Sequence, residues 1–98
     1  MAIALDISSG QIDVGDTKIL NVTPVDADGA VVVLTALSVV FTPATGVATT
    51  KTLGDFTLVA GVYSVSFTFA SAGRWNITIT ATDGAGQVEV EQGCIRVK

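Results

Sequence analysis

The strongest constraint on this chain is an alternation of apolar and polar residues that recurs along its length, interrupted by turn residues roughly every 10 to 15 positions. An alternation of period two places one set of side chains on one face of a β-strand. No sustained helical period occurs, and β-branched residues dominate the apolar runs. The pattern therefore predicts an all-β fold in which residues 1–98 form a single domain, a β-sandwich of immunoglobulin-like size with about 7–9 antiparallel strands.

Turn residues set the bounds of the expected strands. The first strand contains Ile3, Leu5 and Ile7 and ends at Ser8-Ser9-Gly10. The others span residues 17–25, 31–34, 37–42, 47–53, 56–59, 62–69, 74–82 and 87–97. The separator Asp26-Ala27-Asp28-Gly29 also resembles the beginning of a Ca²⁺ loop, but the twelfth position of that loop would be Leu37 instead of an acidic residue. A tight turn, which favours Asp and Gly, is therefore preferred over a metal site.

Two consecutive runs, 62–69 and 74–82, are predicted to supply much of the core. One face of each run is apolar, formed by Tyr63, Val65, Phe67 and Phe69 in the first and by Trp75, Ile77, Ile79 and Ala81 in the second. We expect the runs to be antiparallel neighbours that stack these side chains as cross-strand pairs, which favours a core role for the aromatic residues over a sugar platform. In the last strand, Val88 and Val90 have the opposite parity to Ile95 and Val97, which predicts a β-bulge near Gln92-Gly93.

The residue inventory excludes most catalytic and metal-binding classes. The chain has no histidine and one cysteine, so Ser-His-Asp and Cys-His catalysis, His-ligated metals and an internal disulfide are excluded. No glycine-rich phosphate-binding motif occurs. We therefore expect no enzymatic activity, no cofactor and no metal. Cys94, between Gly93 and Ile95 in a strand-like stretch, is expected to be a buried structural residue.

Charge and hydropathy limit the partners. The net charge is −4, and the five basic residues form no run, so nucleic acid is not an expected partner. No apolar stretch approaches the roughly 20 residues that a membrane helix needs, so no membrane association is expected. The N-terminal residues also lack the basic segment of a secretory signal, which predicts a protein made in the cytoplasm.

One segment indicates contact with another protein. Val31, Val32, Val33 and Leu34 are four consecutive apolar residues, and a half-buried strand would expose at least two of them. The segment is either enclosed within the fold or covered by another subunit, and we favour the second interpretation. Hydrophobic residues make up 49% of the chain and charged residues 14%, against about 25% charged in typical soluble domains, which also favours a covered surface. The expected partner is protein, with the chain as a homo-oligomer or in many copies within an assembly.

From about residue 19 onward the chain resembles short immunoglobulin-like structural proteins of tailed bacteriophages. The motifs that carry the resemblance are Asp26–Gly29, a strand ending in Pro43, Gly61–Tyr63, Gly73–Trp75, and the acidic Val88–Glu91 leading to Ile95-Arg96-Val97-Lys98. The resemblance implies a virion component made in the host cytoplasm.

The resulting functional prediction is a non-enzymatic structural protein of a virion, with a capsid decoration or cement protein bound to the shell as the leading possibility. The major capsid protein or other virion subunits are the partners that it implies. The alternatives are an immunoglobulin-like adhesion module for a cell-surface glycan or protein, or a module of the phage tail or neck.

Overall fold

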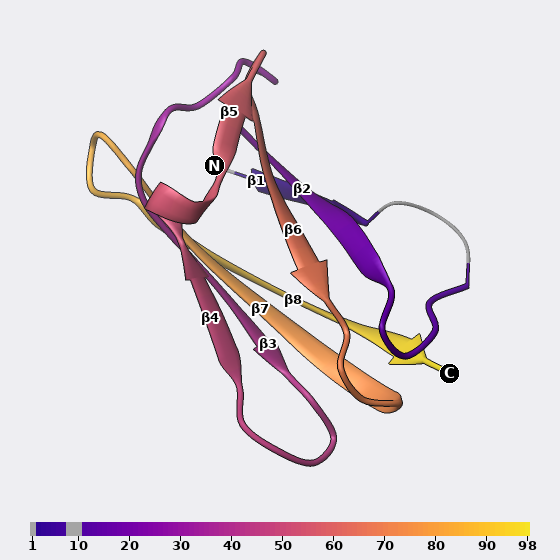
Figure 1. The fold of residues 1–98 in the computed structure, drawn as a ribbon. Coiled ribbons are helices and arrows are strands. Elements are labelled where there is room, and N and C mark those ends of the chain that lie inside the picture. Colours follow the sequence, from indigo (N-terminus) through magenta and orange to yellow (C-terminus); the bar gives the residue numbers. More distant parts are fainter. Residues whose placement is uncertain (1, 8–10) are drawn as a thin grey trace.

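The computed structural model describes residues 2–7 and 11–98, which form two four-stranded antiparallel sheets packed face to face (Figure 1). The first sheet has the strand order β1-β2-β6-β5 and the second the order β4-β3-β7-β8. The strands are β1 (Ala2–Ile7), β2 (Thr17–Val25), β3 (Leu34–Thr42), β4 (Thr49–Thr52), β5 (Thr57–Val59), β6 (Val62–Thr68), β7 (Gly73–Asp83) and β8 (Val88–Val97), with one 3-10 turn, η1 (Leu53–Asp55). This arrangement confirms the predicted all-β sandwich, and the eight strands of the described part of the chain fall within the expected range.

Residues 11–16 connect the two layers at one end of the sandwich. Ile12 forms a parallel bridge with Val97, the amide of Lys98 donates to the carbonyl oxygen of Ile12 (2.8 Å), and the amide of Val14 donates to the carbonyl oxygen of Lys98 (3.0 Å). The amide of Gly15 donates to the carbonyl oxygen of Phe69 just beyond β6 (2.7 Å). This segment therefore fixes the position of β8 against the first sheet. The expected end of the first strand at Ser8-Ser9-Gly10 lies outside the described residues.

The core lies between the two sheets and has an aromatic centre. The rings of Phe41 and Phe67 stack with centroids 3.9 Å apart, one from each sheet. Trp75 meets Phe67 and Phe69 edge to face, at centroid distances of 5.6 and 5.3 Å, an arrangement that the ring quadrupoles favour. Tyr63 and Trp75 are 3% and 4% exposed, so the predicted core role of both aromatic residues is confirmed.

The predicted pairing of the two apolar runs is wrong. β6 pairs with β2 and β5 in the first sheet, whereas β7 pairs with β3 and β8 in the second. The two strands face each other across the core instead of lying side by side. The reason is the connection between them: residues 69–72 cross from one layer to the other, and the Trp75 indole N–H holds this crossing by donating to the carbonyl oxygen of Ser71 (3.0 Å). Alternation fixes which face is apolar, but not to which sheet a strand belongs.

Two predictions for the last strand are also wrong, the β-bulge near Gln92-Gly93 and the burial of Cys94. The β7–β8 register runs without a shift from Gly73↔Val97 to Thr82↔Val88, so there is no bulge near Gln92-Gly93. Val88 and Val90 are 58% and 53% exposed on the outer face, and Cys94, which shares their parity, is exposed as well. β8 is an edge strand with no third layer beyond it, so the even-numbered residues of this strand remain open to solvent.

Two hairpin-like turns use the same hydrogen-bond arrangement. Asp26 accepts the amides of Asp28 and Ala30 on one carboxylate oxygen (both 2.9 Å), and the amide of Gly29 donates to the Asp26 carbonyl oxygen (3.0 Å). In the second turn, the Asp83 carboxylate accepts the amides of Ala85 and Gln87, and the amide of Gly86 donates to the Asp83 carbonyl oxygen. Gly29 and Gly86 have φ values of 80° and 84°, in the left-handed region that glycine adopts readily. The Asp26 carboxylate is thus held by backbone donors, as the predicted tight turn requires.

No helix in the described part of the chain is long and apolar enough to cross a membrane.

Candidate binding surface

The segment from Val31 to Leu34 divides between surface and core. Val31 and Val33 are 57% and 68% exposed, Leu34 is 4% exposed, and Val32 is partly buried against the core. The predicted separate strand at 31–34 is wrong: Val31 forms only an isolated bridge, and Leu34 begins β3, which continues through the predicted strand at 37–42. The two exposed residues agree with the number expected for a half-buried segment. Leu34 belongs to the core, contrary to its prediction as an interface residue, and Val32 packs against the core, so only Val31 and Val33 of this segment are open to solvent.

Backbone and side-chain hydrogen bonds hold this segment in place. Val31 forms an antiparallel bridge with Val25, and the amide of Val32 donates to the carbonyl oxygen of Pro24 (3.2 Å). The amide of Leu34 donates to the hydroxyl oxygen of Tyr63, a buried contact of 2.9 Å. Because the hydrogen bonds begin before Val31 and end after Val33, the two exposed valines are presented by a fixed backbone.

The β5–β6 turn lies against this segment. Ala60 and Gly61 have φ values of 51° and 81°, and two consecutive positive values are typical of the type I′ turn that joins tight hairpins. A Cβ atom at Gly61 would lie 2.6 Å from Cγ1 and 2.9 Å from Cγ2 of Val31, so the glycine allows a backbone approach that other residues would prevent. The turn and the 26–33 loop are at the same end of the sandwich (Figure 1).

Strand β5, which leads into this turn, adds two exposed aliphatic residues to this end of the molecule. Leu58 and Val59 are 48% and 66% exposed. Together with Val31 and Val33 they form what we call the apical patch. The patch contains no titratable or nucleophilic side chain, so it is suited to apolar contact and not to chemistry. Leu58 and Val59 were not identified from the sequence as part of this surface. Two adjacent apolar residues in a short strand are nevertheless a signal, because one of them has to face outward.

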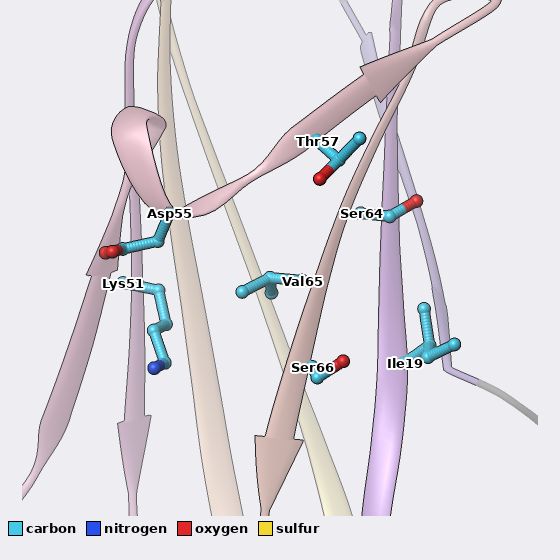
Figure 2. A pocket seen from close by; sticks show the side chains of 7 residues that line it. All are labelled: Ile19, Lys51, Asp55, Thr57, Ser64, Val65 and Ser66. Atoms are coloured by element: carbon cyan, nitrogen blue, oxygen red, sulfur yellow. The ribbon is translucent and has the colours of Figure 1, made fainter.

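A second feature is an open groove of about 380 Å³ along the side of the sandwich (Figure 2). It exists because β5 pairs with β6 only as far as Ser64, so the rest of β6 has no hydrogen-bonded neighbour on this side. Lys51 and Asp55 lie on the β4–η1 side of the groove, and the side chain of Val65 points into the space between the sheets (Figure 2). The remaining lining residues are Ile19, Thr57, Ser64 and Ser66.

The polar groups of the groove are mostly engaged in local structure. The Asp55 carboxylate accepts the amide and hydroxyl of Thr52 (2.9 and 3.4 Å), which caps η1. The Ser64 hydroxyl donates to the side-chain oxygen of Asn21 (2.7 Å). Within residues 2–7 and 11–98, no group of three or more acidic, Cys or His side chains is placed to hold a metal ion. The groove therefore offers one ammonium group, from Lys51, and hydroxyl groups to a bound molecule.

Comparisons with known proteins place the chain in a family and support its fold. The YtkA-like family profile matches residues 2–80. No curated protein matches the sequence. In structure, the chain is similar to part of the chitinase ChiW from Paenibacillus sp. str. FPU-7, a bacterial cell-surface-expressed multi-modular enzyme.

The similarity to the chitinase has a TM-score of 0.66 at 17% sequence identity. It covers 96% of this chain but 8% of the chitinase, and at this identity it shows a shared fold and nothing of function. The family match extends over more than half of the chain, from β1 well into β7. The chain therefore belongs to the YtkA-like family.

Proposed function

We propose that the protein is a non-catalytic binding module that attaches to another protein through the apical patch. The observation that carries this proposal is the exposure of Val31, Val33 and Val59, at 57%, 68% and 66%, on two segments that approach closely where Gly61 lies against the Val31 side chain. Exposed apolar groups on a rigid backbone suit the centre of a protein interface, because little conformational freedom is lost when they are covered.

The proposal also agrees with the way this fold occurs elsewhere. A similar domain forms a small part of the multi-modular chitinase ChiW, which supports a role as a module that serves a larger assembly. Attachment to a bacteriophage shell, which the sequence predicts, is one form of the same function and stays a prediction. Adhesion to a cell-surface protein is a second form.

Site-specific photo-crosslinking in the cells or particles that contain the protein tests the proposal. We would place p-benzoylphenylalanine at position 33, and in a control variant at position 47. Val47 is 88% exposed in the β3–β4 loop, outside the apical patch, and is therefore a matched exposed valine. We expect one discrete crosslinked protein from position 33 and none from position 47, and mass spectrometry of the product would identify the partner. Equal crosslinking from both positions, or none from position 33, would refute the proposal.

A further inference from the structure

Two arginine side chains lie directly opposite each other in the β7–β8 hairpin, at the end farthest from its turn. The register pairs Arg74 with Arg96, and both are exposed on the outer face of the second sheet. Like charges in directly opposed positions destabilise a sheet, because their Cβ atoms are only about 4.5–5.5 Å apart. The sequence conceals this pair because the two arginines are separated by 21 intervening residues.

Nothing in the described part of the chain neutralises this charge. The Arg74 guanidinium donates to the Sγ atom of Cys94 (3.4 Å), and among residues 2–7 and 11–98 no acidic side chain forms a salt bridge with either arginine. The strand next to β7 on its other side contributes Thr42, which pairs with Asn76. The protein has a net charge of −4, so the surface at Arg74 and Arg96 is locally positive on a protein that is negative overall.

The surface around the pair is hollow and rich in hydrogen-bond donors. A depression of about 420 Å³ is lined by both arginines together with Gly73, Cys94 and Ile95. An adjoining depression adds the side-chain amides of Asn76 and Gln92. Guanidinium groups match the geometry of oxyanions such as carboxylates and phosphates, and amide N–H groups can complete the hydrogen bonds of such an anion.

The geometry points to an oxyanion-binding site formed by Arg74 and Arg96, with Asn76 and Gln92 as additional donors. Its ligand is a carboxylate group of an acidic protein segment or a small free oxyanion, which share the same recognition chemistry. Arg96 and Gln92 lie beyond the part of the chain that the family profile matches, so the site depends on residues outside that match. It is independent of the apical patch, which lies at the other end of the sandwich (Figure 1).

Cys94 provides a reporter inside the proposed site, because its exposed sulfur accepts the Arg74 hydrogen bond. We would measure the reaction of this thiol with 5,5′-dithiobis(2-nitrobenzoate), which carries two carboxylates, and with the uncharged 4,4′-dithiodipyridine. In each reaction the thiolate forms a mixed disulfide and displaces one thiolate of the reagent. The ratio of the two rates reports attraction of the anionic reagent and cancels changes in the nucleophilicity of Cys94.

The test compares the Arg74→Gln/Arg96→Gln variant with Lys51→Gln, which removes a cation from the opposite side of the sandwich. We expect the rate ratio to fall about 3- to 10-fold in the arginine variant at low salt, and to change little in Lys51→Gln. The wild-type ratio should also fall when salt is raised to about 0.5 M, because salt screens exposed charges. An arginine variant with the wild-type ratio would overturn the proposal.

A second measurement separates the two sources of the anion. Tetraglutamate and inorganic phosphate would each be added as competitors while Cys94 reacts with the uncharged reagent. Stronger protection by tetraglutamate assigns the site to protein carboxylates, and equal or stronger protection by phosphate assigns it to small oxyanions. Absence of protection by both, in the wild-type protein, would overturn the proposal.

Discussion

Replacing Gly61 with alanine tests whether the close approach of Gly61 to the Val31 side chain requires a glycine for the stability of the fold. Gly61 has a φ of 81°, and an alanine there costs about 1–2 kcal/mol, because the left-handed region brings its Cβ near a carbonyl oxygen. The new Cβ would also lie 2.6 Å from Cγ1 of Val31, a distance at which one of the two residues has to move. The backbone of Val31 is held by its bridge to Val25, so the simplest response is rotation of the Val31 side chain away from its preferred rotamer.

An off-rotamer side chain costs about 0.5–1.5 kcal/mol. The total loss expected for Gly61→Ala is therefore about 1.5–3.5 kcal/mol, a large share of the roughly 5–15 kcal/mol that stabilises a domain of this size. Urea unfolding followed by tryptophan fluorescence measures this loss directly, because the single tryptophan, Trp75, is buried in the core.

Gly29→Ala is the matched control for this prediction. Gly29 has a nearly identical φ of 80°, but nothing lies within 4 Å of the position that its Cβ would occupy. Gly29→Ala should show the backbone cost alone, and Gly61→Ala should exceed it by about 0.5–1.5 kcal/mol. In the double variant Val31→Ala/Gly61→Ala, compared with Val31→Ala alone, most of this excess should disappear, because the two Cγ atoms are gone and only the Cβ of residue 31 remains, 3.3 Å away. If the two glycine variants lose equal stability, within about 0.5 kcal/mol, the reasoning about the Val31 contact is wrong.

Four further substitutions test other features of the fold by the same unfolding measurement. Asp26→Ala and Asp83→Ala should each lower the free energy of unfolding by about 1–2 kcal/mol and by similar amounts, since both carboxylates accept two backbone amides in the same turn; unequal losses would contradict the equivalence of the turns. Ala60→Asn should stabilise the protein by about 0.5–1 kcal/mol, because asparagine tolerates a φ of 51° better than alanine, and a loss would argue against the type I′ turn. Tyr63→Phe should cost about 1–3 kcal/mol, because the buried amide of Leu34 loses its acceptor; a neutral result would show that water replaces the hydroxyl group.

The individual strands were predictable because their side chains alternate strictly between two environments. β2 has the bounds that the turn residues indicate, and the aromatic residues of β6 and β7 are buried on the predicted faces. The parity of a strand follows from local sequence, since successive side chains point to opposite faces and one face meets the core. The exposure of two residues between Val31 and Leu34 was also expected from the sequence, although Val31 to Val33 precede β3 and are not part of a strand.

Pairing between strands was less predictable because it depends on the path of the connections. Nothing in the short stretch Ala70-Ser71-Ala72 indicates that the chain changes sheets there instead of forming a hairpin. In β8, the assumption that Val88 and Val90 must face the core produced the incorrect bulge. The Arg74–Arg96 pair was likewise hidden, because opposing residues are known only once the β7–β8 register is known.

The unbroken register of β8 also explains why another strand is not expected to add to this edge of the sheet. The inward-facing parity of β8 that holds Val97 and Ile95 also contains Glu89 and Glu91, which pair with Ala81 and Ile79 of β7. Charged residues on the inner face of an edge strand oppose the addition of another strand, because extending the sheet would deprive the carboxylates of water. The two exposed valines of β8 therefore lie beside a protected edge. The apical patch and the proposed oxyanion site lie outside the stretch from Glu89 to Glu91, so these carboxylates do not oppose binding at either place.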